Sequence, residues 1–192
     1  MMTKLTVLIA CLFGSAAAMA FEYDDQAVSS TSYSSYSSNL KLREERKVGV
    51  GTHLGGSAGL LGIHLELNIE SQDGVLTGFG FGEGFSTYSI AWKRSYEGLF
   101  FTPYTTLGWS RWFSSSGNKS PDSYMLDSTL SRREREEGRF GIDYIVGAVG
   151  AQYNQLEGEL AGASLFAEVD LFMSPAKGKT MPSAAVGATY FF

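Results

Sequence analysis

Apolar and polar residues alternate along most of the chain after residue 47. In the stretch 59–70, every second residue from Leu61 to Ile69 is apolar, and the residues between them are small or polar. A repeat of two residues places successive side chains on opposite faces, which is typical of a β-strand. The same pattern predicts eight strands, at about 48–56, 59–70, 75–82, 85–95, 99–112, 138–153, 161–173 and 181–192.

The alternation assigns a face to each residue of these strands. In 161–173 the apolar face runs from Leu165 to Met173, and Glu168 and Asp170 lie on the other face. The strand 99–112 is the least regular, and Pro103 within it lacks the N–H that a ladder uses. In 138–153 the predicted apolar face consists of Phe140, Ile142, Tyr144, Val146 and Ala148.

The last strand carries a specific resemblance. Its alternating apolar residues end on two aromatic residues, Tyr190 and Phe192. The chain resembles the small eight-stranded bacterial outer-membrane barrels of the OmpA and OmpX type, in which the last residue is usually Phe and the third from last is aromatic. In that family the barrel-assembly machinery reads this end, so the resemblance implies the same role for Tyr190 and Phe192.

The resemblance implies an all-β fold over 48–192: an eight-stranded antiparallel up-and-down transmembrane β-barrel in the bacterial outer membrane. Both termini would be periplasmic, because an even number of strands returns the chain to its starting side. The links Ser71–Gly74, Ser95–Gly98 and Asn154–Leu160 are short, and the long link, about 113–137, would then be extracellular. The expected partners are the assembly machinery, outer-membrane lipid and lipopolysaccharide.

Alternation alone does not say which face is inside, and a soluble barrel of the lipocalin kind keeps its apolar face inside. The polar faces here carry many glycines and few surface-type Lys or Glu, which favours the membrane arrangement. Aromatic residues also fall at two levels, as interfacial girdles do. These are Phe79, Phe81, Tyr88, Trp109 and Phe140 near the outer rim, and Trp92, Phe101, Tyr190 and Phe192 near the inner rim.

In the membrane arrangement the polar faces line the lumen, and an eight-stranded barrel is just wide enough for side chains to fill it. We therefore predict a structural polar network that plugs the barrel. The two histidines and neighbouring carboxylates are also candidate metal ligands, but such residues commonly occur in a polar lumen without metal, and we expect no metal or cofactor. The predicted network consists of His53, His64, Glu66, Asn68, Glu70, Lys93, Arg139, Asp143, Glu168 and Asp170.

The first 20 residues have the features of a secretory signal peptide: Lys4, an apolar run and a small-residue end at Ala18-Met19-Ala20. A transmembrane helix and a lipoprotein lipidated at Cys11 are the alternatives. Residues 21–47 contain the Ser/Tyr-rich run 29–38 and a mixed-charge run, 41–47. We expect a flexible periplasmic segment here, because such a composition buries too little to fold alone.

Composition narrows the function classes. The chain has 192 residues, a formal net charge of −5, 23 Gly, 13 Phe and 10 Tyr, which suits strands and disfavours nucleic-acid binding. No hydrolase or zinc-protease motif is present, and the glycines of 78–84 do not follow the dinucleotide-binding spacing. We expect a non-enzymatic envelope protein; the alternatives are a narrow pore for small ions or solutes and a lipid-A-modifying barrel enzyme.

The long link contains the charged run from Arg132 to Glu137. A solvated loop explains this run without further function. The alternative is that Arg132, Arg133 and Arg135 contact lipopolysaccharide phosphates, since Arg binds such groups bidentately.

Overall fold

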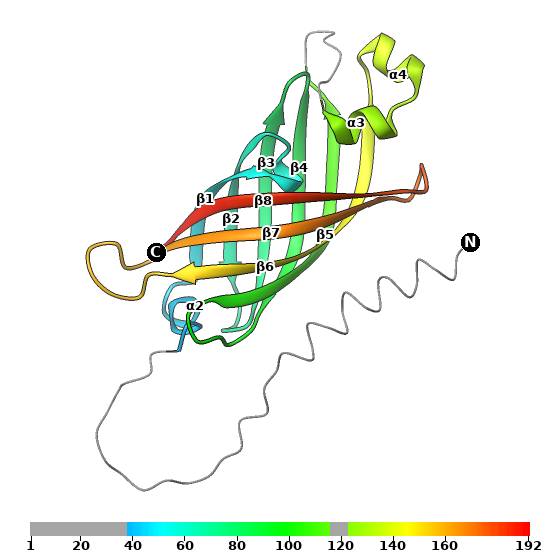
Figure 1. Ribbon diagram of the computed structural model, residues 1–192. Coiled ribbons are helices and arrows are strands. Elements are labelled where there is room, and N and C mark those ends of the chain that lie inside the picture. The colour runs from blue at the N-terminus through cyan, green and yellow to red at the C-terminus, as the bar shows by residue number, and fades with distance from the viewer. Residues whose placement is uncertain (1–37, 116–122) are drawn as a thin grey trace, which may run out of the picture. The chain divides into compact units, whose positions relative to one another are not determined.

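The computed structural model describes residues 38–115 and 123–192, which belong to the unit Ser37–Phe192. The predicted signal peptide 1–20 and the first part of the predicted flexible segment therefore lie outside the described residues. Eight strands form a closed barrel in chain order, each antiparallel to its neighbours, and β1 pairs with β8 (Figure 1). They are β1 (Val48–Gly55), β2 (Leu61–Asn68), β3 (Asp73–Gly82), β4 (Phe85–Ser95), β5 (Thr102–Ser114), β6 (Gly141–Asn154), β7 (Ala163–Ser174) and β8 (Lys179–Phe191). The predicted eight-stranded antiparallel barrel is confirmed.

The strand ends differ little from the prediction. The largest shifts are at the starts of β5 and β6, which begin at Thr102 and Gly141. Pro103 is the second residue of β5 and is exposed on the outer wall. It thus lies near the end of the ladder, where a missing N–H disrupts least.

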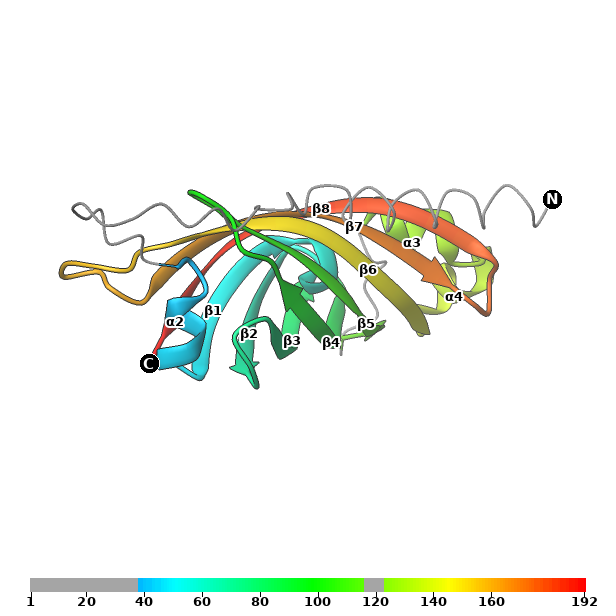
Figure 2. The same ribbon diagram turned by 90° about the horizontal axis from the view of Figure 1, so that it is seen from below.

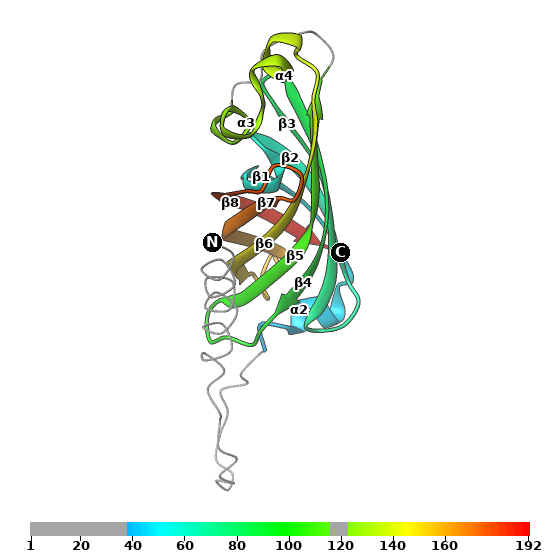
Figure 3. The same cartoon turned by 90° about the vertical axis from the view of Figure 1, so that its right-hand side faces the viewer.

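Helices lie at both ends of the barrel. Helix α2 (Lys41–Glu45) is at the end where the chain terminates, and α3 (Tyr124–Thr129) and α4 (Arg132–Glu137) are at the opposite end (Figures 1 and 2). Residues 123–137, which are part of the link between β5 and β6, are called the lid below. Figure 3 shows the same separation of α2 from the lid. Among the described residues, no helix is both long and apolar enough to cross a membrane.

The link between β1 and β2 turns into the barrel. Its 3₁₀ helix η1 (Gly56–Ala58) contacts strands on several sides of the barrel, including β3, β4, β7 and β8. Glycines make room for it: a Cβ on Gly80 would lie 2.2 Å from the carbonyl oxygen of Ala58. Ala58 is buried, so η1 fills part of the lumen.

The apolar faces form the outer wall. Ile63 is 56% exposed and Leu165 is 62% exposed, whereas Glu66, which faces inward, is 1% exposed. This is the inverted arrangement expected of a membrane barrel and the opposite of a soluble one. Phe79, Phe81 and Tyr88 are exposed on the outer wall toward the lid, and Trp92, Phe101, Tyr190 and Phe192 toward the α2 end.

Strand β6 corrects the predicted facing. Ile142, Tyr144, Val146 and Ala148 point inward, and Ile145 and Val149 lie on the outer wall. The register explains this, because Ala148 pairs with Thr106 on one side and with Asp170 on the other, and both of those residues are buried inside. Both faces of β6 are apolar, so its alternation did not distinguish them; a shift of one residue reverses every side chain.

The interior is apolar at the lid end. Met125, Leu126 and Leu130 of the lid pack against aromatic residues from the strands. Phe140, which was predicted to lie in the outer aromatic girdle, is buried in this cluster. The Trp112 ring stacks on Phe85 with centroids 5.0 Å apart and meets Tyr144 and Phe172 edge-on. The lumen therefore has an apolar part under the lid and a polar part toward α2. The complete cluster is Phe85, Trp112, Met125, Leu126, Leu130, Phe140, Ile142, Tyr144, Val146, Phe172 and Met181.

Candidate functional site

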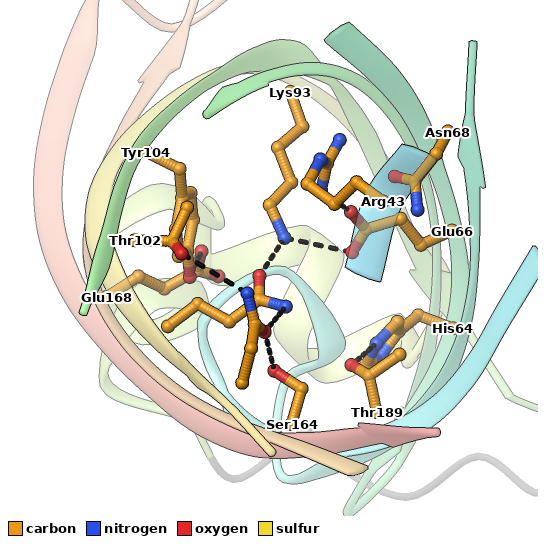
Figure 4. A network of polar contacts seen from close by, with 12 residues as sticks. Arg43, His64, Glu66, Asn68, Lys93, Thr102, Tyr104, Ser164, Glu168 and Thr189 are labelled. Carbon is orange, nitrogen blue, oxygen red and sulfur yellow. Dashed lines mark hydrogen bonds and ion pairs between the residues drawn. The ribbon is translucent and has the colours of Figure 1, made fainter. Parts of the chain in front are cut away.

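Glu66 on β2 accepts hydrogen bonds from two cations in the polar part of the lumen, and Figure 4 shows these side chains and their neighbours. Lys93 from β4 donates to Glu66 Oε2 at 2.9 Å, and Arg43 from α2 donates to Oε1. All three side chains are almost completely buried. A buried carboxylate is unfavourable unless it is paired, and two cations satisfy this one.

Arg43 corrects the prediction for residues 38–47. These residues are not a flexible lead-in: α2 places Leu42 and Arg43 against the barrel end, and the Arg43 Nε donates to the Ser71 carbonyl oxygen at 3.0 Å. The sequence shows Arg43 only as one member of a mixed-charge run. The weak signal was the pair Leu40 and Leu42, whose side chains are also buried.

The network continues from Lys93 to the opposite wall. Lys93 donates to Gln152 Oε1 at 2.6 Å, and Gln152 donates to Asn154 Oδ1 at 2.9 Å. Asn154 in turn donates to Thr102 and to the carbonyl oxygen of Asn39 beside α2. The network thus ties β2, β4 and β6 to the segment before β1, and we call Arg43, Glu66, Lys93, Gln152 and Asn154 the Glu66 network.

A second group of acidic residues lies on β7. The Tyr104 hydroxyl donates to Glu168 Oε2 at 2.8 Å, and the Lys93 ammonium lies 4.4 Å from the centre of the Tyr104 ring. Asp170 is buried on the same face of β7. Among the described residues, neither Glu168 nor Asp170 forms an ion pair.

The two histidines contact each other. The Nδ1 atoms of His53 and His64 are 3.1 Å apart, so one ring donates and the other accepts, and His64 Nε2 lies 2.9 Å from the Thr189 hydroxyl. The Phe166 ring lies edge-on to His64 with centroids 5.5 Å apart. In the part of the chain that the structure describes, no group of three or more His, Cys, Asp or Glu residues is arranged to hold a metal ion.

The predicted lumen residues separate into two groups. His53, His64, Glu66, Asn68, Lys93, Glu168 and Asp170 face the interior. Glu70 is exposed beyond the end of β2, and Arg139 is exposed before the start of β6. Asp143 is about half exposed on the outer wall, where its carboxylate lies 3.8 Å from Arg111, because β6 has the reverse facing.

The charged side of the lid forms several ion pairs. Arg132 and Arg133 bind Glu136 and Glu137 at 2.8 and 2.6 Å, and Arg135 binds Asp127 at 3.2 Å. At the start of α4, Ser131 and Glu134 form a reciprocal capping box. Hydrogen bonds from the backbone N–H and the hydroxyl of Ser131, with the Lys177 ammonium, lower the pKa of Glu134 to about 2.

The end of β8 presents its aromatic residues outward. Tyr190 and Phe192 are exposed on the outer wall, with ring centroids 5.1 Å apart, whereas Phe191 between them is buried. The backbone N–H of Phe192 donates to the carbonyl oxygen of Val48 at 2.8 Å, so the last residue belongs to the closing seam.

No family model matches the sequence, and no curated protein is significantly similar to it. Among solved structures, the N-terminal β-barrel domain of Pseudomonas aeruginosa OprF is similar at 16% identity and a TM-score of 0.52, over 76% of this chain and 98% of that domain. A de novo designed transmembrane β-barrel (11% identity, TM-score 0.46, 76% and 95% covered) and the Yersinia pestis outer membrane protein Ail (12%, 0.40, 77% and 99%) are more distant. The match to OprF and the outward apolar faces lead to one conclusion: this chain has the fold of the small eight-stranded outer-membrane barrels.

Proposed function

We propose that this protein is a non-enzymatic outer-membrane β-barrel of the bacterial envelope whose lumen is closed and whose lid faces the cell exterior. The observation that carries the proposal is the pairing of an apolar outer wall with a buried, hydrogen-bonded polar interior. In this proposal α2 and the end of β8 lie on the periplasmic side, and the longest link, 115–140, lies on the exterior side.

Three layers support a closed lumen. The Glu66 network crosses the barrel at the α2 end, η1 fills part of the middle, and the lid packs apolar side chains into the other end. An ion that crossed the lumen would have to displace all three layers. A filled structural barrel is therefore favoured over a narrow pore.

The geometry of the histidines argues against lipid modification. An acyl-transfer or deacylation site needs a His near the outer leaflet with a Ser or carboxylate to activate, and its substrate chain must reach it. His53 and His64 are buried inside the barrel and hydrogen-bond to each other and to Thr189. These contacts suit a structural role.

Membrane fractionation and planar-bilayer recording test this proposal together. We expect the protein in the outer-membrane fraction, with a gel mobility that changes on boiling, and no steady unitary conductance when it is reconstituted. A steady conductance that changes in Glu66→Gln would overturn the closed lumen in favour of the pore. Recovery of the protein in the soluble fraction would overturn the membrane assignment.

The lid supports a proposed contact with lipopolysaccharide. The side chains of Arg132 and Arg133 are 93% and 87% exposed, and each has one exposed glutamate partner. Exposed i,i+4 pairs contribute only about 0.3–0.5 kcal/mol, so a phosphate group can compete for either guanidinium. Arg135, which also binds Asp127 and two lid carbonyls, is less free to turn outward.

Binding of purified lipopolysaccharide to the detergent-solubilised protein tests this contact. We expect the double variant Arg132→Gln, Arg133→Gln to bind several-fold more weakly, because two charge-assisted hydrogen-bond sites are lost. Arg94→Gln, an exposed arginine at the α2 end of β4, is the matched control and should bind as the wild type does. Equal loss in the control would show only nonspecific attraction, and no loss in the double variant would remove the proposed contact.

A further inference from the structure

Asp170 is a buried acid with no ion-pair or hydrogen-bond partner in the described part of the chain. Its side chain lies on the inner face of β7, the residue is 2% exposed, and its Oδ2 atom has no hydrogen-bond donor among the described residues. Gly56 of η1 leaves room for this oxygen, since a Cβ at that position would lie 2.6 Å from it. A carboxylate held away from water is strongly unfavourable unless positive charge or hydrogen bonds compensate it.

The nearby cations are bound elsewhere. Lys93 donates to Glu66 and Gln152, and Arg43 donates to Glu66 and the Ser71 carbonyl oxygen. Glu168 lies two residues before Asp170 on the same face, and among the described residues it accepts a hydrogen bond from the neutral Tyr104 hydroxyl alone.

The acids of the polar lumen outnumber its cations. Its described charged side chains are two cations, Arg43 and Lys93, and three acids, Glu66, Glu168 and Asp170. When all three acids are ionised and both histidines are neutral, one negative charge is left over, and either a bound proton or a bound cation must neutralise it.

A cavity adjoins the two unpaired acids. It has a volume of about 60 Å³, and its polar lining includes Glu168, Asp170, Tyr104, the two histidines and the paired Glu66 and Lys93. Strands β3, β4 and β5 contribute small residues, among them Gly78, Ser89, Ala91 and Gly108, and the larger Leu76, Ile90 and Trp109. Since about 10–15 Å³ of such volume holds one water, the cavity has room for an ion with some of its hydration.

We propose that this cavity binds one small monovalent cation, such as Na⁺ or K⁺, through the carboxylate of Asp170, with Glu168 as a second oxygen ligand. Carboxylate and hydroxyl oxygens are hard donors, which suit such cations. The single uncompensated charge favours a monovalent ion, and the lack of a three-residue metal group in the described chain disfavours a tightly held transition metal. The proposal needs the enclosed lumen but does not depend on what the lid contacts.

Cation-dependent stability tests the site. The purified, folded protein is unfolded by heat in detergent at equal ionic strength in NaCl, KCl or N-methyl-D-glucamine chloride, whose large cation does not fit the cavity. At a Na⁺ or K⁺ concentration about ten times the dissociation constant of the site, the unfolding temperature should be about 3–6 °C higher than in N-methyl-D-glucamine chloride. Asp170→Asn, which keeps the shape but removes the charge, should abolish the difference, and Glu168→Gln should reduce it.

Glu159→Gln is the matched control, because Glu159 is an exposed acid between β6 and β7. It should keep the full difference between the salts. Equal unfolding temperatures of the wild type in all three salts, or a difference that survives in Asp170→Asn, would overturn the proposal.

Two measurements on the wild type keep the test decisive if a variant does not fold. Thallium-205 NMR should show a bound Tl⁺ signal that excess Na⁺ or K⁺ displaces, and absence of that signal would count against the site. Infrared spectroscopy distinguishes a bound cation from a bound proton. A protonated buried carboxyl band at neutral pH, unchanged by Na⁺, would show that a proton neutralises Asp170 and would overturn the proposal.

Discussion

At the residue scale, buried and exposed charges contribute very different amounts to the free energy of unfolding. Glu66, Arg43 and Lys93 are almost fully out of water, whereas Lys41 and Glu45 form an exposed pair 3.6 Å apart in α2. Removing one member of a buried ion pair costs about 3–5 kcal/mol, because the remaining charge loses its compensation. Exposed pairs contribute at most about 1 kcal/mol.

We therefore expect Glu66→Gln to be more destabilising than Arg43→Met. The first change leaves Arg43 and Lys93 buried without an anion and should cost about 3–5 kcal/mol. The second leaves Glu66 still paired with Lys93 and should cost less. Urea unfolding of the detergent-solubilised barrel measures both, with Glu45→Gln as the exposed control, which should change stability by less than about 0.5 kcal/mol. Similar losses for Glu66→Gln and Glu45→Gln would contradict the role of the network.

At the element scale, the lid is a short helical segment whose apolar side enters the barrel and whose charged side stays in solvent. Met125, Leu126 and Leu130 join the cluster around Trp112, while Lys177 from the link between β7 and β8 binds Glu134 at 2.9 Å. The contact joins the lid to a link next to it at the same barrel end. Glu134 thus completes the capping box of α4, whose N-cap is Ser131, and also binds Lys177; we call these two contacts of Glu134 the clamp.

The clamp makes the lid sensitive to acid. The pKa of Glu134 in the folded lid is about 2, below the ordinary value of 4.5. Because the folded-state pKa is lowered, the stabilisation of the folded lid by ionised Glu134 is complete above about pH 4.5. This stabilisation is lost as the pH falls toward 2. Hydrogen-exchange protection of the α4 amides should therefore fall over that range in the wild type, and the Glu134→Gln variant should have low protection throughout. Glu136→Gln, which removes a surface pair only, should keep the pH dependence; an unchanged profile in Glu134→Gln would contradict the clamp.

At the scale of the whole molecule, closure depends on the seam between β1 and β8. Seven residue pairs join the two strands, from Gly49 with Phe191 to Gly55 with Ala185. The seam joins the first and last strands of the chain, so it closes only when all of the others are present. A defect at this seam would leave the barrel open, and this is the physical basis of the proposed role of Tyr190 and Phe192 in assembly.

Phe192→Ala should therefore lower the amount of assembled barrel more than it lowers synthesis. The expected measure is the fraction of protein with the mobility of the folded form in an unboiled gel, compared with the total after boiling. Phe101→Ala is the control, since Phe101 is an exposed aromatic at the same end of the barrel. Equal folded fractions in both variants and the wild type would show that Phe192 carries no assembly signal.

The facing of most strands could be predicted because only one of their faces is apolar. In β2, β7 and β8 the alternation separates residues such as Leu65, Val169 and Val186 from Glu66, Asp170 and Thr189, and the structure keeps that separation. In β6 the alternation was ambiguous, and the prediction chose the wrong face. The interior at the lid end is apolar, so Tyr144 and Val146 find an apolar environment there just as they would on the outer wall.

The sequence by itself determined the number of strands and, in every strand but β6, which residues share a face, because a repeat of two residues along a continuous segment encodes both. The outward direction of the apolar faces was predicted from the glycine-rich polar faces, the two aromatic levels and the resemblance of the last strand. Only the tertiary structure decided which residues share the lumen. Arg43 meets Glu66 across 23 positions in the chain, η1 folds inward over Gly80, and Met125 reaches the cluster around Trp112. Such contacts form because the closed barrel brings together segments that are far apart in the sequence. A local periodicity carries no information about which distant segments will meet.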